Sequence, residues 1–285
     1  MFTARAPEPS YEFPEPLAAL LAGRPAEAVW VNALDGVTVR LPDEDAYLKW
    51  QPPGTRLPAL ALEEERLRWA SRELALRRGA AAAEHPAEPD EVAARIVAAR
   101  LDGIGAEGPD DDDHPTTVPR VLEHGADGRG EWLVTAALPG RSAVDPVWLA
   151  RPEVAVPAIG RELRRLHESF DVERCPYDWS VEQRLRLAPP DVAPRFAEAP
   201  PVDRLVVCHG DACAPNTLLA EDGTGAGHVD LGALGIADRW ADIAVAARST
   251  EWNYGPGWER ALVAGYGVPF DDERMRFYRE LWDAE

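Results

Sequence analysis

Two carboxylates and one amide in the second half of the chain stand where a phosphoryl-transfer site needs them. Asp211 lies five residues before Asn216, and Asp230 follows further along. Transfer of a phosphoryl group from a nucleotide needs one carboxylate to orient the attacking hydroxyl and accept its proton. It also needs an amide oxygen and a second carboxylate to hold Mg²⁺ on the phosphates. Asp211 is therefore the candidate base, and Asn216 and Asp230 are the candidate metal ligands.

The expected local structure brings these side chains together. Thr217–Leu219 and Gly227–Val229 flank a run of turn-forming residues, which is a hairpin signature. Asn216 precedes the first strand and Asp230 follows the second, so antiparallel pairing places them about 5 Å apart at one end. Asp211 lies on the loop that leads into the same end. The three groups should therefore converge on one spot.

The order of the motifs favours this chemistry over a structural alternative. The apolar run Leu205–Val207 predicts a buried strand, and His-Gly-Asp at 209–211 follows it. With Asn216 and Asp-Leu-Gly at 230–232, the spacing is that of H-x-D-x-x-x-x-N and D-x-G in protein kinases. The alternative is a turn-rich hairpin whose Asp and Asn bond their own backbone. A lone H-x-D would favour that alternative, but three elements in the right order favour catalysis.

Longer stretches around these residues resemble the aminoglycoside phosphotransferases, most closely the 3'-phosphotransferases. The resemblance rests on VCHGDACAPNTLL at 207–219 and HVDLGALGIADRWADIAVAARS at 228–249. It implies an α+β, bilobal, protein-kinase-like fold, with a small antiparallel sheet lobe that carries one helix and a larger, mainly helical lobe that carries the catalytic hairpin. The implied domains are 1–137, which binds the nucleotide and contains an insertion at about 74–116, and 138–285, which carries catalysis and substrate binding.

The only lysine of the chain is the candidate phosphate ligand. Three strands are expected around it, at Ala28–Asn32, Val37–Leu41 and Ala46–Trp50, and Lys49 lies near the end of the third. A compact ammonium fits between phosphate oxygens and a carboxylate, whereas arginine is a wide planar fork. This favours a functional lysine over an exposed strand-end residue. In the resemblance Lys49 pairs with the α- and β-phosphates, and Gly36 in the first hairpin covers the ATP phosphates.

The next helix should supply a carboxylate partner for Lys49. Residues 60–69 have a helical composition. The family pattern E-x-x-x-L-x-W selects Glu63. Glu64 and Glu65 remain open, because a shift of one residue exchanges them.

The hinge between the lobes is expected after Trp132–Ala136, the last strand of the small lobe. By the resemblance, the carbonyl of Ala136 and the N–H of Leu138 bond the adenine, since Pro139 has no donor. Before that strand, the insertion contains an expected helix at 90–101. It also contains an acidic run at 110–113, which we interpret as a solvated, mobile loop and not as a metal site.

The large lobe should contain helices at Ala158–Phe170 and Asp271–Trp282, and a third that opens at Ala237–Asp242 with Asp238 as its N-cap. Asp242 resembles the buried aspartate that steadies the catalytic loop in the family, and His167 is expected to be packed and hydrogen-bonded.

The substrate residues come from the resemblance alone. In relatives the terminal residues line the aminoglycoside pocket, which makes Trp282, Asp283 and Glu285 candidates, and the loop before residue 205 adds Asp191 and Glu198. Two departures bear on the substrate. Ala233 replaces the arginine that usually follows D-L-G, and the loop at 187–203 is short.

Composition limits the classes of partner. The formal net charge of −20 argues against nucleic acid and anionic membranes and would favour a cationic substrate, although acidity can also serve solubility alone. We expect a cytoplasmic monomer or homodimer, since no stretch predicts a membrane span or a signal peptide. The three cysteines show neither zinc spacing nor a disulfide framework.

The leading hypothesis is an ATP- and Mg²⁺-dependent 3'-O-phosphotransferase acting on an aminoglycoside, with GTP as an alternative donor. The nearest alternative is a kinase of the same fold acting on another small alcohol, such as an amino sugar or a choline-like metabolite. A catalytically inactive kinase-fold binding protein is a third class, which the presence of Lys49, Asp211, Asn216 and Asp230 disfavours. A P-loop enzyme is excluded, because G-x-x-x-x-G-K-[ST] is absent.

Overall fold

The computed structural model describes residues 11–32, 34–55, 59–84, 115–189, 192–196 and 198–284. The expected helix at 90–101 and the acidic run at 110–113 lie outside these ranges. The same holds for two candidate substrate residues, Asp191 and Glu285. None of the described helices is long and apolar enough to cross a membrane.

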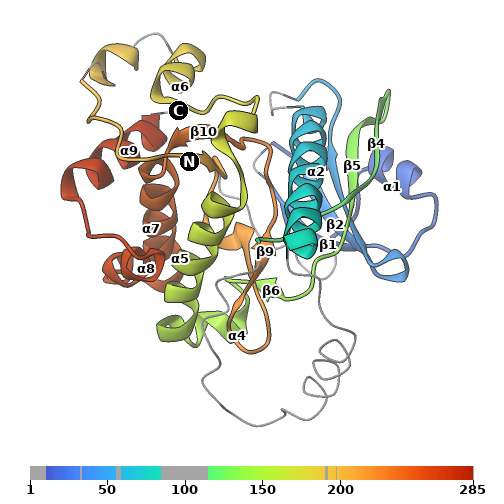
Figure 1. The fold of residues 1–285 in the computed structure, drawn as a ribbon. Helices are drawn as coiled ribbons and strands as arrows, with labels where there is room; N and C mark the ends of the chain where they lie inside the picture. The colour runs from blue at the N-terminus through green and yellow to red at the C-terminus, as the bar shows by residue number, and fades with distance from the viewer. Residues whose placement is uncertain are drawn as a thin grey trace, which may run out of the picture.

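A five-stranded antiparallel sheet forms the small lobe together with helices α1 (Glu15–Leu21) and α2 (Leu60–Glu84) (Figure 1). The strands, in spatial order, are β1 (Glu27–Val31), β2 (Val37–Leu41), β3 (Ala46–Gln51), β5 (Gly130–Ala136) and β4 (Val121–Asp127). The four expected strands are confirmed to within about two residues at their ends. The strand β4 was not predicted. Lys49 pairs with Leu133, so the lysine strand lies beside the strand that leads into the hinge.

The helix α2 begins where the sequence predicts but continues to Glu84, beyond the expected end at Trp69. Its extension is rich in Ala, Leu, Arg and Glu, which have high helix propensity. Leu74 is fully buried and prolongs the apolar face of the helix. Arg77 donates from Nη1 to the carbonyl of Glu168 at 2.6 Å. The first part of the range assigned to an insertion is therefore helical, and Arg77 attaches it to α5 of the large lobe.

The large lobe combines helices with two small sheets. Its helices are α4 (Pro146–Leu149), α5 (Pro152–Ser169), α6 (Val181–Leu187), α7 (Trp240–Tyr254), α8 (Glu259–Tyr266) and α9 (Asp272–Ala284). Its sheets are β6 (Arg141–Ser142) with β8 (Thr217–Leu219) and β9 (Gly225–His228), and β7 (Leu205–Cys208) with β10 (Gly235–Asp238). The helices expected at 158–170 and 271–282 are confirmed, except that α5 ends at Ser169 and α9 begins at Asp272.

The helix expected to open at 237–242 begins instead at Trp240. Residues 235–238 pair with β7 in antiparallel fashion and form β10. Asp238 nevertheless accepts the backbone N–H of Trp240 at 3.0 Å, so its carboxylate satisfies one of the N–H groups left open at a helix start.

Two hydrophobic clusters divide the molecule. The smaller one joins α1 to the strands β1, β2 and β3. The larger one fills the large lobe and also takes in Leu67 and Leu74 of α2. The same cluster contains Val121 of β4 and Leu133 of β5, so α2 packs against the sheet of its own lobe (Figure 1). It also contacts the large lobe, where Trp69 packs against Phe170 with 5.2 Å between the ring centres.

Candidate active site

The strand, loop and hairpin place the three candidate groups at one end, as the spacing predicts. Thr217 pairs with His228 across β8 and β9. One residue further out, the N–H of Val229 donates to the carbonyl of Asn216 at 3.0 Å. Asp230 follows in the left-handed region with a φ of 65°. Its side chain reaches Lys49 Nζ at 2.8 Å.

Asp211 lies in the catalytic loop, defined here as residues 209–216. Its N–H donates to His209 Nδ1 at 3.2 Å, and Asn216 Nδ2 donates to its carbonyl at 2.9 Å. Its Oδ1 is buried and accepts no hydrogen bond from any residue that the structure describes. Burial, followed by the negative charge of Asp230, raises the pKa of Asp211 from 3.8 to about 6. A buried oxygen with no donor is suited to receive one from a ligand.

Lys49 lies between two carboxylates. Its Nζ is 2.7 Å from Glu63 Oε1 and 2.8 Å from Asp230 Oδ1. Burial opposes its charge, but Asp230 and Glu63 outweigh that effect and raise the pKa of Lys49 above its ordinary value. Partial desolvation of the Asp230 carboxylate is likewise outweighed by the charge of Lys49, which lowers the pKa of that carboxyl. Burial raises the pKa of Glu63, although the Lys49 ammonium opposes that shift.

Of the three glutamates considered as the partner of Lys49, Glu63 is the one that is buried and contacts the Lys49 ammonium. Glu64 pairs instead with Arg68 at 2.7 Å. Glu65 lies 3.4 Å from the Tyr177 hydroxyl.

The donor set fits a magnesium ion. Asn216 commits its amide nitrogen to the carbonyl of Asp211, which leaves the amide oxygen as its ligand atom. The Asp230 side chain is 49% exposed although it touches Lys49. An amide oxygen and an accessible carboxylate are the hard oxygen ligands that Mg²⁺ prefers.

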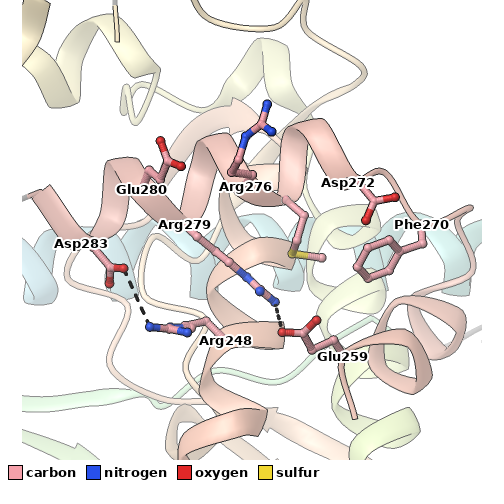
Figure 2. A pocket seen from close by; sticks show the side chains of 9 residues that line it. Arg248, Glu259, Phe270, Asp272, Arg276, Arg279, Glu280 and Asp283 are labelled. Carbon is pink, nitrogen blue, oxygen red and sulfur yellow. Dashed lines mark ion pairs between the residues drawn. The ribbon is translucent and has the colours of Figure 1, made fainter. Parts of the chain in front are cut away.

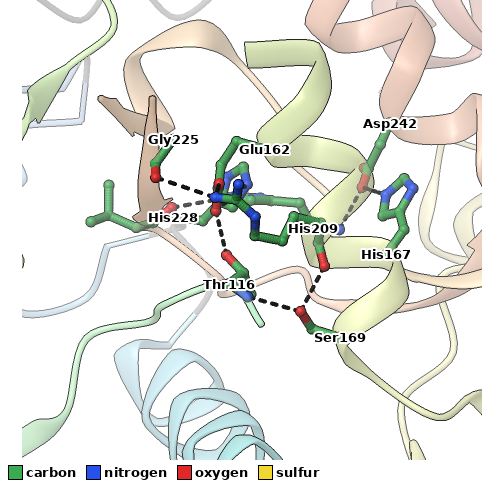
Figure 3. A network of polar contacts seen from close by, with 10 residues as sticks. Thr116, Glu162, His167, Ser169, His209, Gly225, His228 and Asp242 are labelled. Atoms are coloured by element: carbon green, nitrogen blue, oxygen red, sulfur yellow. Dashed lines mark hydrogen bonds and ion pairs between the residues drawn. The ribbon is translucent and has the colours of Figure 1, made fainter. Parts of the chain in front are cut away.

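A buried aspartate holds the start of the catalytic loop, as the sequence indicates (Figure 3). Asp242 accepts the N–H groups of His209 at 2.5 Å and Gly210 at 3.0 Å, and it contacts His167 Nε2 at 2.9 Å. Gly210 has a φ of 85°, and a Cβ there would lie 2.2 Å from the carbonyl oxygen of Ala233. Only glycine fits this close approach between the two loops.

A second buried carboxylate, which sequence reasoning missed, supports the hairpin from below (Figure 3). Glu162 accepts the Thr116 hydroxyl at 2.6 Å and Arg165 Nη1 at 2.5 Å. The same Arg165 nitrogen donates to the carbonyl of Gly225 at 3.2 Å. His228 Nε2 lies 4.0 Å from Glu162. The network joins α5 to the strand that ends next to Asp230. No local pattern marks Glu162 as a support of the hairpin, because Thr116 and Gly225, which the network joins, are distant from it in sequence.

The protein groups expected to bind the nucleotide lie in the β1–β2 turn and in the hinge. The Gly36 N–H donates to Asn32 Oδ1 at 2.9 Å, which closes the turn between β1 and β2. In the hinge, the N–H of Ala136 is bonded to the carbonyl of Arg120. Among the described residues, nothing accepts the N–H of Leu138.

The candidate substrate residues are placed only in part. A cavity of about 300 Å³ lies along α9 and contains Asp283, which is 4.0 Å from Arg248 (Figure 2). Trp282 is half-buried and Glu198 is exposed, and neither lines this cavity. Its charged side chains are three arginines and four carboxylates: Arg248, Arg276, Arg279, Glu259, Asp272, Glu280 and Asp283.

A sequence profile described as the phosphotransferase enzyme family matches residues 39–278. The aminoglycoside 3'-phosphotransferase of Streptomyces fradiae is 36% identical over 199 residues, which cover 59% of this chain and 73% of that protein. A crystal structure of an aminoglycoside-3'-phosphotransferase of type VIII matches with a TM-score of 0.65 and 28% identity, over 95% of this chain and 98% of that one.

A third similarity is to aminoglycoside phosphotransferase APH(3'')-Id from Streptomyces rimosus in complex with ADP and streptomycin. Its TM-score is 0.62 and its identity 26%, over 93% of this chain and 95% of that one. These similarities confirm the α+β, bilobal, kinase-like architecture expected from the sequence.

Proposed function

Because the chain belongs to the phosphotransferase enzyme family, we propose that it transfers the γ-phosphate of ATP to the 3'-hydroxyl of an aminoglycoside. The observation that carries the proposal is the buried Oδ1 of Asp211, which accepts no hydrogen bond from the described residues, beside Asn216 and Asp230. The domain that binds the nucleotide would comprise residues 1–137, and the catalytic and substrate-binding domain residues 138–285.

Asp211 acts as the base in this proposal. Its Oδ1 accepts the hydrogen bond of the substrate hydroxyl and then its proton, as the hydroxyl oxygen attacks the γ-phosphorus. The bond from the γ-phosphorus to the β–γ bridging oxygen breaks in the same reaction, and ADP leaves. The hydrogen bond from Asn216 to the Asp211 backbone, together with the grip of Asp242 on residues 209 and 210, holds the carboxylate in place. Such pre-positioning spares the reaction the entropy of bringing base and hydroxyl together.

Asn216 and Asp230 hold Mg²⁺ in this proposal. When bound, the ion neutralises charge on the transferring phosphate. Lys49 contacts the α- and β-phosphates, and Glu63 keeps its ammonium oriented through the 2.7 Å pair. In this proposal Asp230 serves two partners, the ion and Lys49, and the 2.8 Å distance from its carboxylate to Lys49 Nζ supports the second.

The adenine would lie at the hinge, with the carbonyl of Ala136 as acceptor and the N–H of Leu138 as donor. Support comes from the backbone, since no described residue accepts the Leu138 N–H. Gly36 in the β1–β2 turn would lie over the phosphates. The ADP complex of the Streptomyces rimosus relative supports a nucleotide site in this fold.

The acceptor in this proposal is a cationic aminoglycoside. The relatives named above and the net charge of −20 support it. Asp283 and Trp282 on α9 would contact it, joined by Glu198 and by Asp191 and Glu285. The 3' position follows the relatives of that name, whereas the 3'' name of the streptomycin-bound relative makes the 3''-hydroxyl the direct competitor.

One experiment tests the proposal. ADP release would be measured in a coupled assay with a panel of aminoglycosides that carry or lack the 3'-hydroxyl, and with amino sugars and choline. NMR of the product would locate the phosphate. We expect turnover only of 3'-hydroxylated aminoglycosides, with Asp211→Asn as the background control. Efficient phosphorylation of an uncharged or small alcohol, with no aminoglycoside turned over, would refute the proposal and leave a small-alcohol kinase.

A further inference from the structure

The loop that follows Asp230 lies along one side of α2. We define residues 230–234 as the DLG loop. At its start, Asp230 reaches Glu63 through Lys49, with distances of 2.8 and 2.7 Å. In the middle, a Cβ at Gly232 would lie 3.6 Å from Glu63 Cβ. At its end, the carbonyl of Leu234 accepts Arg66 Nε at 2.9 Å. The loop is therefore attached to α2 at both ends.

Arg66 is held to the large lobe at a second point. Its guanidinium carbon lies 4.7 Å from the centre of the Tyr177 ring, which is the distance of a cation–π contact. Tyr177 belongs to the large lobe, since its carbonyl accepts the N–H of Ile236 in β10 at 2.8 Å. Its ring also packs edge-on against Trp69, one turn along α2 from Arg66. Arg66 thus bridges α2 and two segments of the large lobe.

The spacing explains why this bridge bears on the site. Glu63 and Arg66 are three residues apart in α2, so their side chains lie on neighbouring parts of one face. A rotation or shift of α2 that moved Glu63 away from Asp230 would also break the hydrogen bond from Arg66 to Leu234. The bond therefore opposes such a movement. Phosphoryl transfer of the kinase type needs both the Lys–Glu pair and the metal-binding Asp in place at once.

We infer that Arg66 is a positioning residue that fixes α2, and with it the Glu63–Lys49 pair, against the DLG loop. Its role rests on the proposed phosphotransferase function but not on the identity of the acceptor, because the geometry it sets concerns the nucleotide end of the site. The contacts of Arg66 with the DLG loop and Tyr177 are to a backbone carbonyl and an aromatic ring. Its effect on nucleotide binding is therefore indirect and passes through Glu63 and Asp230.

The same helix supplies a matched control. Arg68 lies two residues further along and forms an exposed pair with Glu64 at 2.7 Å, within α2. Removing it deletes a guanidinium of the same size from the same helix but leaves the attachment to the DLG loop intact.

The test compares Arg66→Gln, Arg66→Lys and Arg68→Gln. Calorimetry would give the dissociation constant of Mg·ATP, steady-state kinetics would give kcat and the KM of each substrate, and thermal unfolding would give the Tm. We expect Arg66→Gln to weaken Mg·ATP binding and raise the KM for ATP about tenfold, the scale of one charge-assisted hydrogen bond. The KM of the acceptor should change less than about twofold.

Arg66→Lys should recover most of the affinity, because an ammonium can donate to Leu234 and lie on the Tyr177 ring. Arg68→Gln should match wild type. A merely structural role would lower the Tm of Arg66→Gln with Mg·ATP affinity unchanged at low temperature, and that result would overturn the inference. Equal losses in the Arg66 and Arg68 variants would overturn it too. If Arg66→Gln does not fold, Tyr177→Leu tests the same bridge, with a few-fold loss of Mg·ATP affinity expected.

The proposed function can fail separately. If wild type binds Mg·ATP but phosphorylates no aminoglycoside, the acceptor assignment is wrong, while the affinities of the Arg66 and Arg68 variants still decide the role of Arg66.

Discussion

Asp211 combines a raised pKa with a buried oxygen to which no residue in the described part of the chain donates. A general base works best when its pKa lies near the operating pH, and burial together with the charge of Asp230 moves Asp211 to about 6. An ordinary aspartate would be a weaker base for a hydroxyl proton. The environment of the residue, and not its type alone, makes it suited to the role.

Replacing this carboxylate should separate catalysis from binding. Asp211→Asn should lower kcat by about 10²- to 10⁴-fold and leave the affinity for Mg·ATP near that of wild type, because Asn216 and Asp230 remain. Steady-state kinetics and calorimetry would measure the two effects. Asp222→Asn, on the exposed turn of the same hairpin, is the control. A variant at 211 that keeps more than about a tenth of wild-type kcat would exclude the residue as the base.

The same substitution should stabilise the protein at neutral pH. The pKa of Asp211 in the folded state, about 6, is above the ordinary 3.8, so the folded protein holds this proton more tightly than the unfolded chain. Ionising the carboxyl therefore costs stability as the pH rises from about 4 to about 6, and the cost persists above that range.

Asparagine at position 211 does not ionise, so the folded variant does not lose that stability as the pH rises. We expect Asp211→Asn to raise the Tm by a few degrees at about pH 8 and to lose that advantage near pH 4. Thermal unfolding of both proteins across this range measures the effect. A Tm difference that does not depend on pH would show that ionisation of Asp211 is not its source.

At this scale the sequence predicts well only the residues that form a local pattern. Asp211, Asn216 and Asp230 are recognisable by spacing on a short hairpin, and Lys49 by being the only lysine. Glu162 and Arg66 carry no such signal. Their partners Thr116 and Leu234 come from other parts of the chain, so only the folded arrangement shows what they do.

Among the elements, the position of the hairpin β8–β9 depends on contacts with α5 and with the segment before β4. Glu162 fills the space where a Cβ of Gly225 would stand, with its Oε2 only 2.1 Å from that position. Thr116, which bonds this carboxylate, is fixed in turn through its N–H by Ser169 on α5 at 2.9 Å. The carbonyl of Thr117 accepts the N–H of His228 at 2.9 Å. The segment before β4 and the helix α5 therefore jointly set the position of β9.

Removing this carboxylate should destabilise the fold. Glu162→Ala would delete the acceptor of the Thr116 hydroxyl and of one Arg165 N–H in a buried site, so we expect a loss of about 3 kcal/mol in the free energy of unfolding. Urea denaturation measures it. Glu168→Ala is the matched control on the same helix, because its exposed pair with Arg164 should be worth about 0.5 kcal/mol or less. Similar losses in the two variants would mean that burial of the network adds no stability.

The elements that the sequence failed to predict are those made by pairing. The strand β4 reads VLEHGAD, with a glycine and three charged or titratable residues, and it is a strand because it pairs with β5 along its length. The strand β10 is four residues long and exists through its ladder to β7. The helix α2 shows the reverse case. Nearly all of its residues favour helix, so composition alone is consistent with its extension to Glu84, into the range assigned to an insertion.

At the scale of the whole molecule, the protein is strongly acidic, whereas the cavity along α9 contains charges of both signs. The chain carries a net charge of −20. The cavity along α9 nevertheless sets three arginines among its four carboxylates, and Arg279 already pairs with Glu259 at 2.6 Å. A cationic substrate would therefore gain little from any one carboxylate there, and more from the negative potential of the entire protein.

The dependence of the kinetics on salt concentration should separate the effect of the net charge from the effect of local contacts. Potentials from distant charges are screened over about 8 Å at physiological ionic strength. We therefore expect kcat/KM for a polycationic aminoglycoside to fall steeply as salt rises, because the field that attracts the substrate is screened. Deleting residues 283–285 should raise the KM for the aminoglycoside only a few-fold further and spare the affinity for ATP, since each exposed contact contributes roughly 0.2–1 kcal/mol. An uncharged acceptor supplies the control, with little salt dependence expected. If kcat/KM for the aminoglycoside proved insensitive to salt and the deletion alone abolished binding, recognition would lie in local contacts of the terminal residues and not in the acidity of the molecule.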